Sequence, residues 1–318
     1  MSLKGLSKKI NDQINKDIKK ELLNKINSIY HRQLTKIDTL YIEESINFGN
    51  AYVSINNILY YCEVLGCKNI YLNSQINWFI KDKIVTDKFN ISLNTQINCS
   101  DPTTLCANLN SNNFWYYLVI IRPEIRLNII KNEIKRNLPK LIIDEDDLYI
   151  HIRVNNHTNY AQPPLCFYKT IINNYNFKNI YIISGIKKSP IINKLISDYS
   201  NIICQMNSIE VDLSYLTNAF NLIGSQSSFF EVCVKLNDNL KNLFEYDILK
   251  SSEKIFFLHH DFYDYPRKYT IYQMKPSIDY RNKMFVWKME PKQEQYMLEE
   301  RCSYNFEIIK PNFYVQYN

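Results

Sequence analysis

Glycine is rare in this chain, at five of 318 residues. The positions of the five exclude the G-x-G-x-x-G loop that binds dinucleotides and the G-x-x-x-x-G-K-[ST] loop that cradles phosphates. Collagen-like and glycine-rich linker proteins are excluded as well. Any phosphate site in this chain must therefore be built from other groups.

Long apolar runs are also missing. The longest, residues 115–121, suits a buried strand and is far shorter than the roughly 20 residues of a membrane span. The N-terminus, Met1-Ser2-Leu3-Lys4, lacks the apolar run and small-residue cleavage site of a signal peptide. We therefore expect a cytoplasmic protein.

The eight cysteines form no C-x-x-C pair and no Cys/His cluster at zinc spacing. The sequence therefore predicts no metal site at its cysteines. In a reducing compartment we expect most of them to be buried as small hydrophobic side chains.

Charge of one sign does not dominate either. With 38 basic and 32 acidic residues, the net charge of +6 favours an anionic ligand without demanding nucleic acid. A basic module that stacks bases on its aromatic side chains remains an alternative. No basic run or RNP-like strand supports it, so we expect no nucleic-acid partner.

Alternation of short apolar runs with helical patterns predicts the α/β class. The first series has strands at 40–42, 70–72, 91–93 and 115–121, with helices at 50–65 and after Pro123. The second has strands at 148–153, 180–183, 202–204 and 222–223, with helices after Pro164, from Pro190, at 213–219 and after Ser228. Two such series predict two Rossmann-like domains with parallel sheets and a cleft between them.

We expect four regions in the chain. Residues 1–38 hold an amphipathic helix with apolar side chains four residues apart, which docks on the first domain or makes a weak membrane-surface contact. Residues 39–139 form the first domain and residues 140–254 the second. Residues 255–318 form an extension with one helix, 293–302, that packs back across the domains.

Three of the five glycines, Gly49, Gly185 and Gly224, fall at expected strand-to-helix turns. Such turns allow close backbone approach, and the N–H groups that open the next helix favour phosphate. The turn Phe48-Gly49-Asn50 is one candidate site. An ordinary turn glycine is the alternative at each position.

Arg153 ends the expected strand 148–153. A guanidinium at the carboxyl end of a parallel strand can bind a diphosphate through two hydrogen bonds. Pairing with the nearby acidic run Asp144-Glu145-Asp146-Asp147 is the alternative.

Hydroxyl groups gather in the stretch from Asp212 to Phe229, where the turn Gly224-Ser225-Gln226-Ser227-Ser228 follows a strand and opens a helix. This arrangement offers several donors to a phosphate. The alternative is two ordinary helix caps, Asp212 and Ser227.

In this order the three segments resemble the inverting glycosyltransferases that use GDP-fucose, the superfamily of protein O-fucosyltransferases and core fucosyltransferases. The resemblance spans residues 40–240. Gly49-Asn50 resembles the G-N motif, His151-Ile152-Arg153 the H-[IV]-R motif, and Asp212 through Ser228 an acidic residue followed by a [GST]-x-S-S turn. Residues 160–165, Trp287 and Glu294-Gln295 resemble the fungal and protist branch.

The resemblance implies a GT-B fold whose two sheets face a central cleft, and a metal-independent transfer of a fucose-like sugar from a GDP-sugar to a glycan or protein acceptor. No cofactor is implied. Arg153 would contact the donor diphosphate, and Asp212 would bind guanine. The other implied donor-binding residues are Gly49, Asn50, His151, Ser184, Gly185, Ser225, Ser227, Ser228 and Phe229.

One position departs from the family pattern. Many relatives carry an acidic residue three positions after the arginine, where this chain has Asn156, which cannot act as a general base. His157 is a substitute with a suitable intrinsic pKa. A catalytically degenerate binding protein is the alternative.

The acidic run contains a second pattern of interest. Asp144 and Asp146 form a D-x-D motif, which in GT-A glycosyltransferases binds a divalent metal and the donor phosphates. Because the motif precedes a strand here, we expect a solvated turn.

Overall fold

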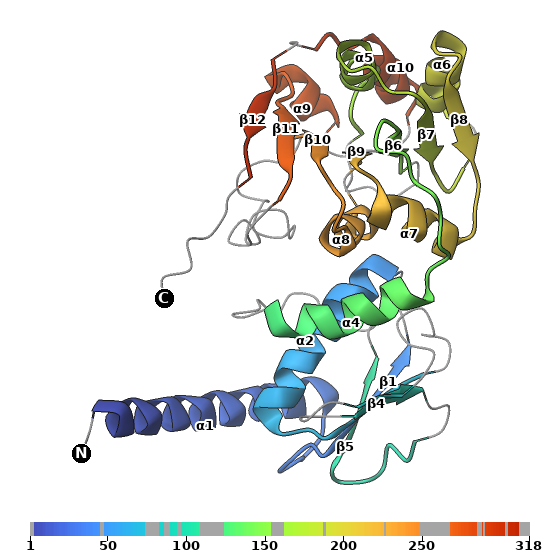
Figure 1. Ribbon diagram of the computed structural model, residues 1–318. Coiled ribbons are helices and arrows are strands. Elements are labelled where there is room, and N and C mark those ends of the chain that lie inside the picture. Colours follow the sequence, from blue (N-terminus) through green and yellow to red (C-terminus); the bar gives the residue numbers. More distant parts are fainter. Residues whose placement is uncertain are drawn as a thin grey trace. The chain divides into compact units, whose positions relative to one another are not determined.

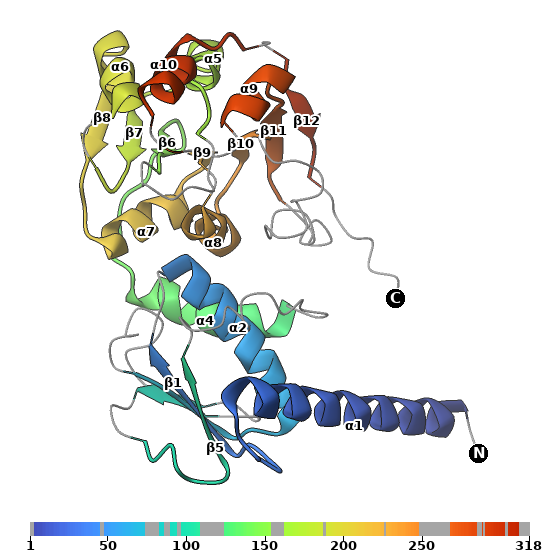
Figure 2. The same ribbon diagram turned by 180° about the vertical axis from the view of Figure 1, so that it is seen from behind.

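The computed structural model describes residues 3–44, 48–73, 83–85, 90–93, 97–108, 124–153, 162–186, 189–225, 227–247, 268–284, 288, 290–302 and 305–311. The chain divides into two compact units, Met1–Asn137 and Leu138–Asn318. Figures 1 and 2 show their elements from opposite sides. Each unit is built around its own sheet.

The sheet of the first unit has the order β3-β4-β2-β1-β5. Its strands are β1 (Thr39–Glu44), β2 (Asn69–Leu72), β3 (Ile84–Val85), β4 (Asn90–Leu93) and β5 (Thr104–Asn108). The pairs of β1 with β2, β1 with β5 and β2 with β4 are parallel, and β3 pairs antiparallel with β4. Buried β-branched and leucine side chains make β1 and β2 core strands.

The described residues of this unit form three helices beside the sheet: α1 (Leu3–Tyr30), α2 (Phe48–Leu65) and α4 (Glu124–Asn137). Both α1 and α4 pack against α2 (Figures 1 and 2). Leu22 and Ile26 of α1 are buried, so this part of the helix belongs to the core of the unit. Gly66 ends α2 in the left-handed region, at a φ of 77°, where glycine is favoured.

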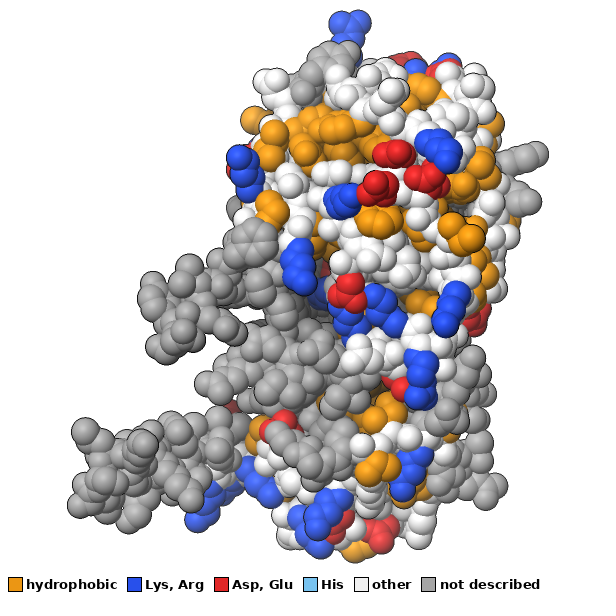
Figure 3. Space-filling view, in the orientation of Figure 1, with side chains coloured by type: hydrophobic (Ala, Val, Ile, Leu, Met, Phe, Trp, Pro, Cys, Tyr) orange, Lys and Arg blue, Asp and Glu red, His pale blue; other side chains and the backbone are white. Residues whose placement is uncertain are grey.

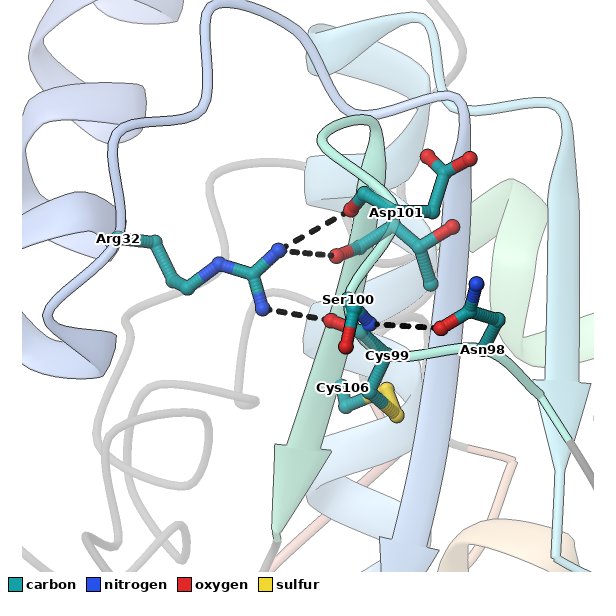
Figure 4. The surroundings of a disulfide bond; sticks show 7 residues. Arg32, Asn98, Cys99, Ser100, Asp101 and Cys106 are labelled. Atoms are coloured by element: carbon teal, nitrogen blue, oxygen red, sulfur yellow. Dashed lines mark hydrogen bonds between the residues drawn. A yellow bond between two sulfur atoms is a disulfide. The ribbon is translucent and has the colours of Figure 1, made fainter.

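A disulfide closes the loop before β5, between Cys99 and Cys106. Figure 4 shows Arg32 reaching the same loop. Its guanidinium donates to the carbonyl oxygens of Cys99 at 2.7 Å, Asp101 at 3.0 Å and Thr104 at 3.4 Å. The side chain thereby ties the chain after α1 to this loop.

The sheet of the second unit has the order β12-β11-β10-β9-β6-β7-β8. Its strands are β6 (Leu148–His151), β7 (Ile180–Ile183), β8 (Ile202–Gln205), β9 (Asn221–Gly224), β10 (Asn242–Tyr246), β11 (Thr270–Met274) and β12 (Glu307–Ile309). All pairs are parallel except β11 with β12. Counted from β6, the six parallel strands have the order 3-2-1-4-5-6 of the Rossmann fold.

Helices cover both faces of this sheet. On one face lie α5 (Leu165–Asn174), α6 (Pro190–Asp198) and α10 (Pro291–Glu299), which contact one another. On the other lie α7 (Ile209–Asn218) and α8 (Ser228–Leu236), also in contact (Figures 1 and 2). A further helix, α9 (Ile278–Met284), contacts α10. The core under α5 and α6 is apolar and aromatic, with Phe167, Tyr168 and Phe244 fully buried.

The α/β class with two mostly parallel sheets is confirmed. The described strands and helices of both expected series are present, whereas the expected strand 115–121 lies outside the described residues. The described part of residues 255–318 belongs to the second unit and adds β11, α9, α10 and β12. The helix expected at 293–302 is α10, which begins at Pro291 and ends at Glu299.

The expectation for the cysteines is wrong for four of the eight. Cys99 pairs with Cys106, and Cys166 pairs with Cys302 across 136 residues. Folding brings each pair of Cα atoms to 5.6 Å, within the range that a disulfide spans. Cys62, Cys67 and Cys233 are buried thiols, as expected. Disulfides favour an oxidising environment, so the cytoplasmic location stays an open prediction.

Candidate functional site

The candidate site lies at the carboxyl ends of β6 and β9, the adjacent central strands of the second unit. The strand order reverses between them, since β7 and β8 lie beyond β6 and β10 and β11 lie beyond β9. Ligands of open α/β sheets bind outside the carboxyl ends of the strands at such a switch point. His151 at the end of β6 is in register with Gly224 at the end of β9, so the segments after both strands emerge together.

The three residues His151, Ser225 and Arg153 are joined directly at this edge. The backbone N–H of Ser225 donates to the carbonyl oxygen of His151 at 3.0 Å. The hydroxyl oxygen of Ser225 accepts from the backbone N–H of Arg153 at 2.9 Å and lies 3.1 Å from Nδ1 of His151. Ser225 is buried, and Arg153 is half-buried at the rim.

His151 is enclosed by aromatic rings of α8. Its ring lies 5.5 Å from that of Phe229 and 5.6 Å from that of Phe230, and the latter pair is stacked. Burial, and secondarily the positive charge of Arg153, lowers the pKa of His151 to about 3. The imidazole is therefore neutral at physiological pH, and it contributes shape and one hydrogen bond rather than charge.

Gly224 allows α8 to pack closely against the end of β9. A Cβ atom at this position would lie 1.8 Å from Cε1 of Phe230, closer than any real contact. Ser227 caps the helix by accepting from the N–H of Phe230 at 3.0 Å. The first turn of α8, with Ser228 and Phe229, therefore begins right beside the ends of β6 and β9.

The loop after β7 lies along the same edge, because His151 is in register with Ile183 as well. Ser184 is buried, and its hydroxyl accepts from the N–H of Ile186 at 3.4 Å. Gly185 is exposed, and a Cβ there would meet no atom within 4 Å. The glycine thus leaves open space at this edge.

Asp212 lies in the first turn of α7, after β8. The helix begins at Ile209 with Ser208 as N-cap, so Asp212 lies inside the helix and does not cap it. Its Oδ1 accepts from Nδ2 of Asn207 at 3.0 Å. Burial raises the pKa of the half-buried carboxyl. Burial makes the ionised form of this carboxyl less favourable, and a ligand that donates hydrogen bonds to the carboxylate would offset that penalty.

The acidic run lies before β6, at the opposite edge of the sheet. Asp144 pairs with Lys178 at 2.6 Å, Glu145 pairs with Lys241, and Asp147 accepts from Nδ2 of Asn179 at 2.9 Å. All three partners lie at the amino ends of the strands, whereas Arg153 follows the carboxyl end of β6. None of these contacts therefore joins the acidic run to Arg153. Among the described residues, no group of three or more His, Cys, Asp or Glu side chains could hold a metal.

The remaining expected site residues fall elsewhere. Gly49 and Asn50 lie in the first turn of α2, in the first unit. His157 and Asn156 lie outside the described residues, as does Trp287. Sequence reasoning missed Phe230 and Asn207, which support His151 and Asp212. The signal for Phe230 was available, since an aromatic residue in the helix after a strand-end glycine can pack on that glycine.

The fold and this edge define a two-unit α/β protein with hydrogen-bond donors and a cation at a Rossmann switch point. No protein-family model and no curated protein matches the chain. Among the helices that the structure describes, none is long and apolar enough to cross a membrane.

Solved structures of glycosyltransferases resemble the fold. The fucosyltransferase NodZ from Bradyrhizobium matches with 10% identity and a TM-score of 0.41, over 65% of this chain and 97% of that chain. NodZ α-1,6-fucosyltransferase co-crystallised with GDP matches with 10% identity and a TM-score of 0.40, over 64% and 93%. A glycosyl transferase family 9 protein from Veillonella parvula DSM 2008 matches with 6% identity and a TM-score of 0.39, over 68% and 82%.

Proposed function

We propose that the second unit binds a nucleotide-diphosphate sugar, with GDP as the nucleotide, and that the chain transfers a fucose-like sugar to a glycan or protein hydroxyl with inversion. The observation that carries this proposal is the placement of Arg153 and the first turn of α8 after adjacent strands at the switch point. Both groups are electropositive. A diphosphate between them would be neutralised from two sides.

Charge develops on the diphosphate as the bond to the sugar breaks. A guanidinium that is already in place stabilises this charge without reorganisation, which lowers the barrier. The backbone N–H groups of the first turn of α8, which includes Ser228 and Phe229, and the positive end of the helix dipole face the same edge and favour a phosphate there. We assign Ser184 and Gly185 to the same phosphate-binding edge.

The choice of guanine rests on Asp212. Guanine presents N1–H and an exocyclic NH₂ on one edge, and two such donors fit one carboxylate. Uracil lacks this pair of adjacent donors. A half-buried carboxylate would therefore gain more from GDP than from UDP.

Metal independence is supported by the engagement of the acidic run in hydrogen bonds and ion pairs at the opposite edge. We keep His157 as the proposed general base, and Gly49 and Asn50 as the proposed contribution of the first unit. Transfer should persist in excess EDTA and should fall in His157→Ala. Loss of transfer in EDTA with rescue by Mn²⁺ would move the site to Asp144 and Asp146.

The decisive experiment measures binding of GDP, UDP and ADP to the whole chain by calorimetry, and transfer from GDP-fucose by release of GDP. Arg153→Ala should reduce turnover by on the order of a hundredfold, and Arg153→Lys should recover only part of it, because lysine lacks the two-pronged contact. Lys178→Ala is the matched control. It removes the same charge from the opposite edge, where an exposed ion pair contributes little.

Each outcome separates the alternatives. Tight GDP binding without release of GDP from GDP-fucose would make the chain a degenerate binding protein. A preference for UDP would reject the assignment of guanine. RNA binding with a steep salt dependence and no nucleotide-sugar binding would favour the nucleic-acid module. On the face shown in Figure 3, Lys and Arg side chains are interspersed with Asp and Glu, which does not favour that module.

A further inference from the structure

The contacts of Ser225 suggest a role that differs from direct phosphate binding. In a parallel pair of strands, the backbone N–H of a residue donates to a carbonyl oxygen of the neighbouring strand. The carbonyl oxygen of the same residue accepts from an N–H of that neighbouring strand, two residues after the first partner. Ser225 makes the first bond normally, to the carbonyl of His151 at 3.0 Å. For the second, its side-chain oxygen accepts from the N–H of Arg153 at 2.9 Å.

This replacement matters for the path of the chain. Because the hydroxyl takes the bond that the carbonyl would accept if β9 continued, the backbone can leave the sheet at Ser225. It can then enter α8, whose N-cap Ser227 follows two residues later. The pairing of β6 with β9 is thereby extended to Arg153 while the helix begins at the same level.

The hydroxyl of Ser225 is itself held by His151, whose Nδ1 lies 3.1 Å away. His151 is fixed by the rings of Phe229 and Phe230, and Phe230 packs on Gly224. Ser225 is only 2% exposed and His151 only 7%. A side chain this buried reaches a bound ligand poorly, but its contacts with its neighbours are well defined.

We propose that Ser225 and His151 are positioning residues that act through Arg153, with Ser225 fixing the Arg153 backbone and donating its hydroxyl proton to Nδ1 of His151. This deepens the proposed function and rests on it. The neutral imidazole must then carry its own proton on Nε2. Burial, which lowers the pKa of His151, keeps it in the neutral form that this arrangement needs.

A double-mutant cycle separates positioning from direct contact. GDP affinity is measured by calorimetry for the wild type, Ser225→Ala, Arg153→Ala and the double variant, with inorganic pyrophosphate as a second probe. When Arg153 is present, Ser225→Ala should weaken GDP binding roughly tenfold, because the backbone N–H of Arg153 loses its acceptor. In the Arg153→Ala background the same change should cost less than about twofold. An equal loss in both backgrounds would overturn the proposal.

Matched variants separate positioning from folding. Thr217→Val removes another buried hydroxyl, which donates to the carbonyl of Leu213 at 2.6 Å in α7, and should leave the affinity unchanged. His151→Asn retains a polar atom near the Nδ1 position and should keep most of the affinity, whereas His151→Phe should lose as much as Ser225→Ala. Equal losses in both His151 variants would contradict the role of the hydrogen bond.

A readout without ligand distinguishes this proposal from the proposed function. The ¹⁵N spectrum of labelled histidine should show His151 as the neutral Nε2–H tautomer at neutral pH. An Nδ1–H tautomer would overturn the positioning proposal even if GDP binds. Coupling between Ser225 and Arg153 in the binding of pyrophosphate but not of GDP would uphold the positioning proposal and reject only GDP as the nucleotide. Binding of neither probe would reject both the positioning proposal and the proposed function.

Discussion

Cys166 of α5 is joined by a disulfide to Cys302, three residues beyond the end of α10. The bond closes a loop of 136 residues that contains all the candidate donor-binding residues from Ser184 to Phe229. It also anchors the last part of the chain to the first helix of the Rossmann-like sheet. The covalent loop therefore contains this part of the candidate site, whereas His151 and Arg153 precede Cys166 and lie outside it.

Removal of this bond should destabilise the second unit. A cross-link over so long a loop reduces the entropy of the unfolded chain, so Cys302→Ser should cost about 3–5 kcal/mol of unfolding free energy. Urea unfolding monitored by tryptophan fluorescence and circular dichroism measures the loss. Cys204→Ser, which changes a half-buried thiol outside both disulfides, is the control.

Thiol labelling tests the same feature independently. Denatured, unreduced protein should react at four of its eight cysteines, namely Cys62, Cys67, Cys204 and Cys233. Eight reactive thiols in protein purified without reductant would contradict the disulfides. That result would favour a reducing environment for the protein.

Gly224→Ala should disrupt the contact between β9 and α8. The added methyl group would overlap the ring of Phe230, which is buried and cannot move aside freely. We expect a loss of about 1–3 kcal/mol in stability, as for other overpacked cores. Gly185→Ala is the matched control for stability, since its Cβ meets no atom within 4 Å. Equal thermal midpoints for the two variants would contradict the packing.

Much of this edge could be predicted because local patterns encode it. Short apolar runs predict β6 and β9. The polar and glycine residues after these runs predict where the strands end, and with that the positions of Arg153, Gly224 and Ser227. The start of α7 was misjudged, because Asp212 looks like a cap, while the helix dipole tolerates acidic residues within the first turn.

Long-range contacts had no local signal. The hydroxyl of Ser225 meets the N–H of Arg153 across 72 residues, and Cys166 meets Cys302 across 136. Strands β3, β5, β10, β11 and β12 were also missed. The last two lie in the aromatic-rich stretch 255–318, which lacks the clear alternation of the earlier strands. Only the folded sheet shows that β10 and β11 complete the Rossmann order.

Asp212→Asn should separate stability from binding. Burial raises the pKa of Asp212, so the ionised carboxylate is less favourable in the folded protein than in the unfolded chain. Between the ordinary pKa of the unfolded carboxyl and the raised pKa of the folded one, the folded state binds more protons. The free energy of unfolding therefore falls as the pH rises through this range. The neutral amide removes this cost, so the thermal midpoint at pH 7 should rise.

GDP affinity should move in the opposite direction in the same variant. We expect Asp212→Asn to lose roughly 1–3 kcal/mol for GDP and little for UDP. In the wild type, GDP binding should weaken as pH falls through the raised pKa. Equal losses for both nucleotides in calorimetry would remove Asp212 from base recognition.

The neutral state of His151 predicts a specific dependence of stability on pH. Burial and the charge of Arg153 lower its pKa to about 3, whereas the unfolded histidine has its ordinary value near 6.5. Between these values the unfolded chain binds the extra proton, so stability is lost as pH falls below 6.5. One such proton contributes a slope that approaches about 1.4 kcal/mol per pH unit.

Urea unfolding of the wild type and His151→Asn between pH 7.5 and 4.5 measures this slope. Because asparagine does not titrate, the difference in stability between the two proteins should shrink steadily as the pH falls below about 6.5. His31→Asn is the control, since His31 is exposed and its left-handed backbone, at a φ of 50°, suits asparagine. If the His151→Asn profile runs parallel to that of the wild type, His151 takes up a proton in the folded protein, and the neutral hydrogen bond to Ser225 is wrong.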